Sequence, residues 1–244
     1  MAIVLVTRPD PDNAATAATL RARGHEVLLA PALRLEPIPL PPGHAADYGA
    51  VIVTSANALR AVAPQLKDHS LLQLPLFAVG EHTAEAARRA GFAEVISADG
   101  DAKALRDCVV RGVRAAPAGP TRPLLYLAGA DVSRDLAGEL GARGIDVTTQ
   151  TTYRMVPVAR LPGDVREAFS ANRIEAILHY STRSARAFLD AARAGGVEIS
   201  ALAIPQCCMS AAVAEVLREA GAVRVAIAAS PNEDALLTAL SRSI

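Results

Sequence analysis

Short apolar runs alternate with segments of helical spacing along the whole chain. Ile3–Val6 is an apolar, β-rich run, the segment after it places Leu20 on an inner face, and residues 27–30 are apolar again. Asp12 or Asn13 is expected to cap the intervening helix. Strand, helix and strand in this order are typical of a parallel sheet covered by helices, and the alternation continues to the end of the chain.

Two of the apolar runs, at 50–53 and 176–179, end abruptly in polar residues and open directly into helical segments. These polar residues are Thr54, Ser55 and Asn57 at the first corner and, beyond His179 and Tyr180, Ser181, Thr182 and Arg183 at the second. The N–H groups of a helix start bind carboxylates and phosphates well. One such corner is most simply a helix cap, but its recurrence, with a further corner at 80–83, favours a cleft that holds an anionic ligand.

The second half of the chain repeats the first. Segments 20–27 and 140–147 match closely, and each half contains an extended stretch after its first strand–helix–strand unit. Five prolines lie in the first of these stretches, at 31, 37, 39, 41 and 42, too many for a central strand or a helix. If the two stretches are crossings, the fold is two similar parallel-sheet α/β domains joined by a two-stranded linker, with a cleft between them. The expected boundaries are 1–35 with 163–244 for one domain, 43–150 for the other, and 36–42 and 151–162 for the paired linkers.

The charge balance excludes two classes of partner. The chain has 25 basic and 25 acidic residues, so no net field attracts nucleic acid or an anionic membrane. Aromatic residues make up only 3% of the chain, which disfavours stacking on bases. The start of the chain has no basic leader and no membrane-length apolar run appears, and the expectation is a cytoplasmic protein that acts on a small molecule as a monomer.

No motif for a metal or a cofactor is present. Cys108, Cys207 and Cys208 form neither an even framework nor a C-x-x-C pair, and the histidines show no ligand spacing. P-loop, Rossmann, nucleophile-elbow and zincin motifs are also missing. Tyr153, in the second extended stretch, has two equally good interpretations: a ring packed between the domains, or a proton donor at the cleft floor.

Taken together, these residues resemble uroporphyrinogen-III synthases, and the resemblance spans nearly the whole chain. The segments that carry it are Val6-Thr7-Arg8-Pro9, Pro31 with Leu33 and Leu35, 53–58, 79–84, Tyr153-Arg154, Tyr180-Ser181, and Ser230-Pro231 with Ala235-Leu236. One departure concerns the last third: the family's Gly-x-x-Thr corner is replaced by Ser210-Ala-Ala-Val213.

The resemblance implies two α/β domains, the first strand and helix packing with the carboxyl-terminal half. It also implies closure of hydroxymethylbilane, a linear tetrapyrrole with eight carboxylates, to uroporphyrinogen III, with inversion of ring D, loss of water and no cofactor. Tyr153 is then the candidate catalytic residue, matching the family's linker tyrosine. The candidate substrate-binding residues are Thr7, Arg8, Thr54, Ser55, Asn57, Gly80, Thr83, Arg154, Ser181, Thr182, Arg183 and Ser210. The alternative is a non-enzymatic two-domain module that binds a small anion in the same cleft.

Overall fold

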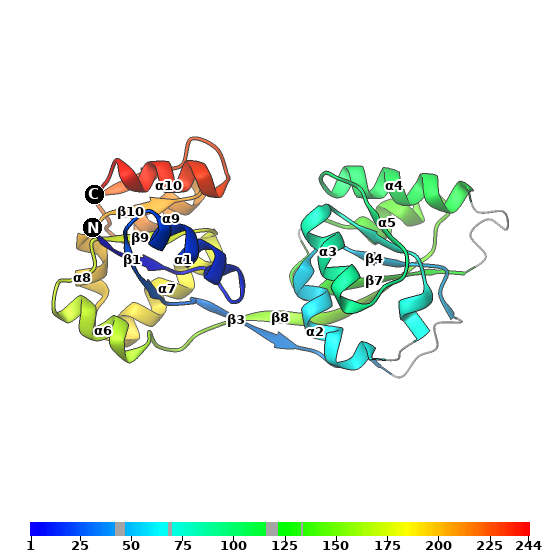
Figure 1. Ribbon diagram of the computed structural model, residues 1–244, viewed down its shortest axis with the longest axis horizontal. Helices are drawn as coiled ribbons and strands as arrows, with labels where there is room; N and C mark the ends of the chain where they lie inside the picture. Colours follow the sequence, from blue (N-terminus) through cyan, green and yellow to red (C-terminus); the bar gives the residue numbers. More distant parts are fainter. Residues whose placement is uncertain (42–46, 68–69, 116–121, 133) are drawn as a thin grey trace. The chain divides into compact units, whose positions relative to one another are not determined.

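The computed structural model describes residues 1–41, 47–67, 70–115, 122–132 and 134–244 (Figure 1). The chain folds as two compact units, Met1–Arg34 with Val156–Ile244 (unit 1) and Leu35–Met155 (unit 2). Each unit is an open sheet with helices on both faces. The prediction of an α/β fold built on parallel sheets is confirmed.

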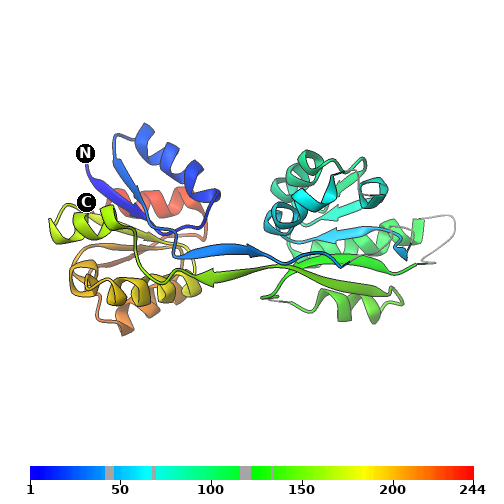
Figure 2. The ribbon, with the colours of Figure 1, turned by 90° about the horizontal axis from the view of Figure 1, so that it is seen from below.

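In unit 1 the sheet has the order β11-β10-β9-β1-β2, and every neighbouring pair is parallel. Helices α1 and α10 cover one face, and α7 and α9 cover the other (Figure 2). The elements are β1 (Ile3–Val6), α1 (Asp12–Ala22), β2 (Glu26–Leu29), α6 (Gly163–Ser170), β9 (Ala176–His179), α7 (Thr182–Ala194), α8 (Glu198–Ala203), β10 (Gln206–Cys208), α9 (Ala211–Glu219), β11 (Val225–Ile227) and α10 (Glu233–Ser241).

In unit 2 the sheet has the order β3-β8-β7-β4-β5-β6. The strands from β8 to β6 are parallel, whereas β3 runs antiparallel to β8, because Ile38 N donates to Thr152 O and Val158 N donates to Ala32 O. The elements are β3 (Leu33–Pro37), β4 (Val51–Val53), α2 (Ala56–Leu66), the 3₁₀ turn η2 (Ser70–Gln73), β5 (Leu76–Ala78), α3 (Glu81–Ala90), β6 (Val95–Ser97), α4 (Ala102–Ala115), β7 (Leu124–Gly129), α5 (Leu136–Gly141) and β8 (Val147–Pro157).

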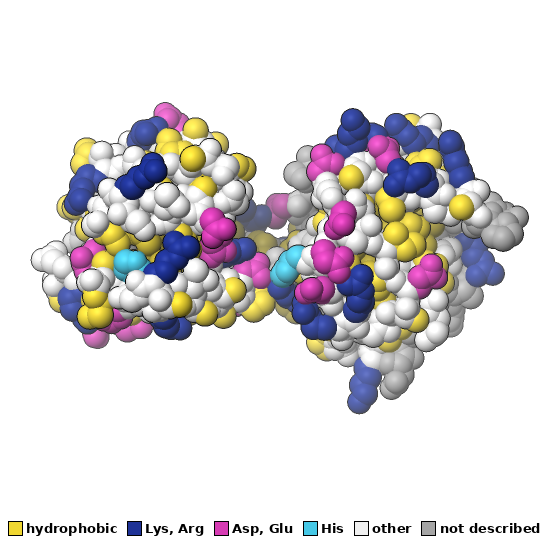
Figure 3. Space-filling view, turned by 45° about the horizontal axis from the view of Figure 1, so that its top comes forward, with side chains coloured by type: hydrophobic (Ala, Val, Ile, Leu, Met, Phe, Trp, Pro, Cys, Tyr) yellow, Lys and Arg dark blue, Asp and Glu magenta, His cyan; other side chains and the backbone are white. Residues whose placement is uncertain are grey.

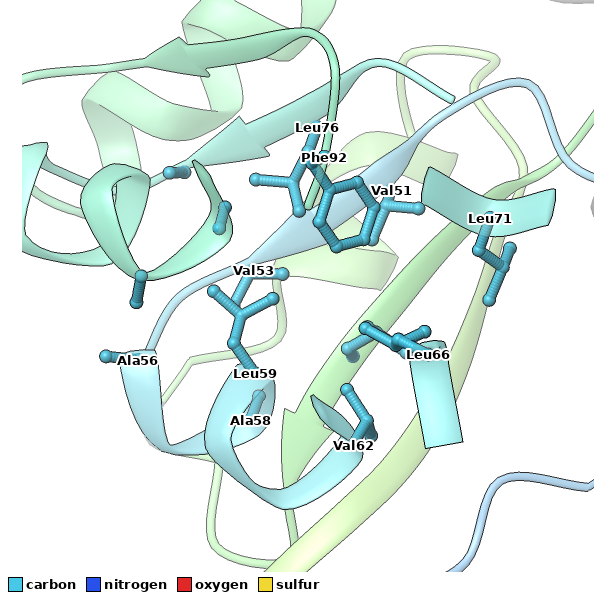
Figure 4. Close-up of a cluster of buried hydrophobic side chains, with 14 of the residues drawn as sticks. Val51, Val53, Ala56, Ala58, Leu59, Val62, Leu66, Leu71, Leu76 and Phe92 are labelled. Carbon is cyan, nitrogen blue, oxygen red and sulfur yellow. The ribbon is translucent and has the colours of Figure 1, made fainter. Parts of the chain in front are cut away.

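Alternating side chains of the central strands divide the apolar core of unit 2 into two layers. Val51 and Val53 of β4 point toward α2 and α3, where Leu59, Leu66 and Phe92 complete the layer (Figure 4). The intervening residues of β4 and β7 point to the opposite face, against α4 and α5. Because both faces of β4 are covered, its sequence is a continuous apolar run.

The two units share one topology with a different chain order. In unit 2, β4–α2–β5–α3–β6–α4 comes first and β7–α5–β8 follows; in unit 1 the counterpart of β7–α5–β8 is β1–α1–β2, at the start of the chain. The match between segments 20–27 and 140–147 arises here, because each covers the end of a helix and the strand after it. The boundaries between the units fall inside β3 and β8.

One local expectation was wrong. Neither Asp12 nor Asn13 caps α1: the cap position is Pro11, which makes no side-chain hydrogen bond, and Asn13 is buried inside the first turn. The stretch 151–162 was expected to pair with 36–42 as a two-stranded linker; in the structure β8 continues to Pro157 and pairs with β3. Its threonines favour a half-exposed strand without forming an apolar run.

Candidate active site

Each sheet has one point where the chain order reverses, and polar corners lie at both points. In unit 1 the chain builds outward from β1 to β2 on one side and from β9 to β11 on the other; in unit 2 it builds from β4 to β6 and from β7 to β8. Ligands of open α/β sheets bind at the carboxyl ends of the two strands that flank such a switch point. Thr7 and Arg8 follow β1, Ser181 follows β9, and Thr54 follows β4.

The corner of unit 2 is organised by hydroxyl groups. The Thr54 hydroxyl lies 2.9 Å from the hydroxyl of Tyr126 on β7. Ser55 caps α2 and accepts a hydrogen bond from Asn57 N at 3.2 Å, and the side-chain oxygen Oδ1 of Asn57 accepts from Arg60 Nη1 at 2.7 Å. Burial raises the pKa of Tyr126, so its hydroxyl keeps its proton at neutral pH. Within the described part of the chain, the Ser55 hydroxyl hydrogen and the side-chain amide hydrogens of Asn57 have no acceptor, so they can serve as donors to a ligand.

Tyr153 lies at the same edge of the sheet. It pairs with Gly129, the last residue of β7, just after a shift of register, and its carbonyl accepts from Ala130 N at 2.8 Å. The ring lies directly over Gly129: a Cβ there would be 2.6 Å from Tyr153 Cζ. A glycine is thus required for this close approach. The structure brings Tyr153 to the carboxyl end of β7, next to β4 and its Thr54–Ser55 corner.

In each sheet the next strand outward from the switch point, β5 in unit 2 and β10 in unit 1, is also followed by a helix whose start has no side-chain cap. Gly80 precedes α3 and Ser210 precedes α9, and neither start has a side-chain capping hydrogen bond. The first N–H groups of these helices therefore remain available to an anion. Thr83, in the first turn of α3, is 5% exposed; Val213, at the matching position of α9, is 2% exposed and packs in the interior.

The corner of unit 1 combines capping with charge. The hydroxyl of the fully buried Thr7 donates to Leu178 O, so Thr7 supports the strand end. Ser181 forms a capping box with Ser184 at the start of α7. The Arg8 guanidinium donates to Glu233 at 2.8 Å. Of the two other candidates here, Thr182 is half-buried and Arg183 is exposed in the first turn of α7.

Arg154 lies away from these corners, on the β3–β8 ladder. Its guanidinium forms an ion pair with Glu36 of β3, with Nη2 2.8 Å from the carboxylate. The pair is exposed on the arginine side. Its position indicates a role in holding the ladder.

Two residues that contact the candidate site, Tyr126 and Glu233, were not predicted from the sequence. Tyr126 is a single polar side chain inside the apolar strand Leu124–Gly129, a signal that was available in the sequence. Glu233 is one of two acidic residues at the start of α10 and gives no such signal, because its partner Arg8 is 225 positions away in the chain.

On the face that Figure 3 shows, both units carry basic as well as acidic side chains. Across the described ranges, His, Cys, Asp and Glu form no group of three or more that could hold a metal ion. None of the helices described is both long and apolar enough to cross a membrane.

Fold and corners together define a class: an α/β protein of two similar units, each with helix starts at its switch point that suit an anionic ligand. The chain belongs to the uroporphyrinogen-III synthase family, since the family model described as "Uroporphyrinogen-III synthase HemD" matches residues 14–238. It is therefore an enzyme of tetrapyrrole biosynthesis, a lyase, and the resemblance seen in the sequence is confirmed.

Solved structures agree with this assignment at the level of the fold. Uroporphyrinogen-III synthetase from Helicobacter pylori has a TM-score of 0.65 at 19% identity, over 99% of this chain and 100% of that one. A mutant uroporphyrinogen III synthase from the extremely thermophilic bacterium Thermus thermophilus has a TM-score of 0.53 at 18% identity, over 100% of this chain and 98% of that one. A search of curated protein sequences gave no significant match.

Proposed function

We propose that this chain closes hydroxymethylbilane to uroporphyrinogen III, with inversion of ring D and loss of one water molecule. The observation that carries the proposal is the polar corner at the switch point of each unit, in a chain of the uroporphyrinogen-III synthase family. A substrate with eight carboxylates needs several anion-binding positions, and helix starts with free N–H groups provide them without a net positive charge.

The carboxylate-binding groups in this proposal are those at the helix starts. In unit 2 they are the donors of Ser55 and Asn57 and the open start of α3 after Gly80, with Thr54 and Thr83 beside them. In unit 1 they are the starts of α7 and α9, at Ser181 with Thr182 and at Ser210. Arg8 and Arg183 add positive charge in unit 1, Thr7 holds the end of β1, and Arg154 orders the ladder that carries Tyr153.

Selectivity between the two possible ring closures demands little energy. The linear substrate also closes without an enzyme, to the isomer with ring D uninverted. A hundredfold preference for the inverted product requires about 2.7 kcal/mol between the competing transition states. Holding the substrate so that the substituted carbon of ring D meets the reactive methylene is sufficient to supply this difference.

Tyr153 is the proposed proton donor. Its hydroxyl protonates the departing hydroxyl group of the substrate, which leaves as water and creates the electrophilic methylene. The proton released when ring D regains its aromaticity returns to the tyrosinate, so the net change is the loss of water. The place of Tyr153 over Gly129, at the edge that carries the unit 2 corner, supports this role.

The test supplies freshly generated hydroxymethylbilane to the purified protein and separates the type I and type III products by chromatography after oxidation. The expected result is predominantly type III product from the wild-type chain and a rate about 100-fold lower from Tyr153→Phe. Type I product at the rate without enzyme would refute the proposed reaction. Full turnover by Tyr153→Phe would refute only the role of the tyrosine.

Two further parts of the proposal concern the state of the protein in the cell. We propose that the enzyme acts as a monomer in the cytoplasm, on a small-molecule substrate. Light scattering on the purified protein tests the monomer, with a dimer mass as the contrary result. Cell fractionation with an antibody against the chain tests the location.

A further inference from the structure

Polar side chains from four elements of unit 1 converge where β1 and β9 end. Arg8 Nη1 donates to Glu233 Oε2 at 2.8 Å, and the Thr16 hydroxyl of α1 donates to the other oxygen of the same carboxylate. The Arg8 guanidinium also lies 5.1 Å from the centre of the Tyr180 ring. The Glu233 carboxylate is thus bound by one guanidinium and one hydroxyl, the kind of donor set that binds a carboxylate ligand.

The fold does not require a carboxylate at position 233. Asn232 already caps α10 through its side chain, as Asp101 caps α4 of unit 2. The residue of α4 that matches Glu233 is Ala102, so the same helix start forms in unit 2 without an acid at that position. The acid at 233 therefore has a reason beyond forming the helix.

Two polar groups beside this cluster are buried without a partner in the described part of the chain. The Tyr180 hydroxyl makes no hydrogen bond, although Thr16 is close to it. Asn13 lies one turn before Thr16 on the buried face of α1; it is 1% exposed, and neither atom of its amide is paired. Unpaired buried polar groups are costly, and both side chains contain donors that a carboxylate accepts.

We propose that Arg8, Thr16 and Tyr180 form a seat for a substrate carboxylate at the switch point of unit 1, and that the Glu233 carboxylate fills this seat until the substrate replaces it. The ligand is a carboxylate side chain of the tetrapyrrole, so the inference rests on the proposed function. Arg8 and Glu233 are 30% and 32% exposed, and a partly exposed pair of this kind is weak enough to exchange. Arg8 keeps a carboxylate partner throughout, and the Tyr180 hydroxyl supplies a donor that Glu233 leaves unused.

The experiment measures the binding of uroporphyrin III, the stable oxidised form of the product, by fluorescence titration. The proteins are wild type, Glu233→Gln, Arg8→Ala and the double variant. Asp234→Asn is the matched control: it removes the same charge from the same turn of α10, but Asp234 is exposed and its carboxylate lies 3.8 Å from Arg23, away from the seat. This control distinguishes two reasons for tighter binding in Glu233→Gln: removal of a carboxylate that competes with the ligand, and removal of a negative charge that repels any anionic ligand.

Removing the competing carboxylate should lower the Kd of Glu233→Gln about three- to fivefold, the upper part of the range for a partly exposed ion pair. Arg8→Ala should raise the Kd at least about tenfold. In the Arg8→Ala background the gain from Glu233→Gln should shrink, because Glu233 then competes only for the Thr16 hydroxyl and no longer for the guanidinium. Asp234→Asn should stay within about twofold of wild type.

Three results would each refute the proposed seat. They are a Kd of Glu233→Gln that is unchanged or higher, an equal fall in the Kd of Asp234→Asn, and an undiminished effect of Glu233→Gln in the Arg8→Ala background. The KM for hydroxymethylbilane should follow the same order as the Kd values. The proposed function fails on a different result, the absence of type III product from the wild-type protein. If the wild-type protein makes type III product but the effects of Arg8→Ala and Glu233→Gln on the Kd are additive, the proposed function stands and only the proposed carboxylate seat is refuted.

Discussion

Replacing Gly129 with alanine tests the place and the role of Tyr153 together. The new Cβ would lie 2.6 Å from Tyr153 Cζ and 2.8 Å from its hydroxyl oxygen. Ordinary contacts between carbon atoms are about 3.5–4.0 Å, so the ring must move by roughly 1 Å or more. Because the clash involves only the far end of the side chain, the ring can swing away, and we expect a loss of stability of about 1 kcal/mol, at the low end of overpacking costs.

The activity should fall much further than the stability. If the Tyr153 hydroxyl donates the proton, moving it by roughly 1 Å should slow the formation of type III product about 100-fold, or about 2.7 kcal/mol. The assays are product chromatography for the rate and urea unfolding for the stability. Gly141→Ala in α5 is the matched control, since a Cβ there meets nothing within 4 Å. If Gly129→Ala kept the wild-type rate and isomer ratio, neither the ring position nor its catalytic role would stand.

Three further predictions concern stability and are measured by unfolding in urea or by heat. Ser181→Ala removes a capping box and should cost about 1 kcal/mol, whereas Ser210→Ala should cost nothing, because Ser210 makes no capping hydrogen bond; equal costs would contradict this. Burial lowers the pKa of His179 to about 4, so below pH 6.5 the unfolded state takes up the proton first. Stability should fall by about 3 kcal/mol between pH 6.5 and 4, and His179→Phe should remove this part of the pH dependence even if it lowers the stability at every pH. The Arg134 guanidinium lowers the pKa of Glu139 to about 2, so this stabilisation is present above pH 4.5 and is lost as the pH falls toward 2. The gap in Tm between wild type and Glu139→Gln should close over that range, and a constant gap would contradict it.

The fold was predictable because its signals are local. A covered strand such as β4 is a continuous apolar run, and a helix start such as Ser55 announces itself within a few residues. The strand β8 is half-exposed and rich in threonine, so it carries no apolar run, and only its start and its extended, paired character were predicted. Where burial on both faces sets the composition, the sequence reveals the element; where burial is partial, it does not.

The contacts of the site were less predictable than its location. The corner at Thr54 follows from the order of residues, but its partner Tyr126 is 72 positions away, and Glu233 is 225 positions from Arg8. The approach of Tyr153 to Gly129 depends on a shift of register between β7 and β8, which no local pattern encodes. Side-chain pairing between distant elements is a property of the packed fold, so these contacts could not be derived from periodicity.

The shared topology turns the differences between the units into an argument about their roles. Both units place an uncapped helix start after the strand next to the switch point, at Gly80 and at Ser210. Unit 2 adds the hydroxyl of Thr83 there, whereas Val213 in unit 1 offers only an apolar side chain, so in the proposed function that corner of unit 1 has backbone N–H groups alone for an anion. At the switch point itself unit 1 has the more strongly polar side chains. It carries the Arg8–Glu233 ion pair, whereas unit 2 carries the paired hydroxyls of Thr54 and Tyr126. Unequal donors on a repeated frame are what a substrate with inequivalent carboxylates requires, since two identical sets would accept it in either direction.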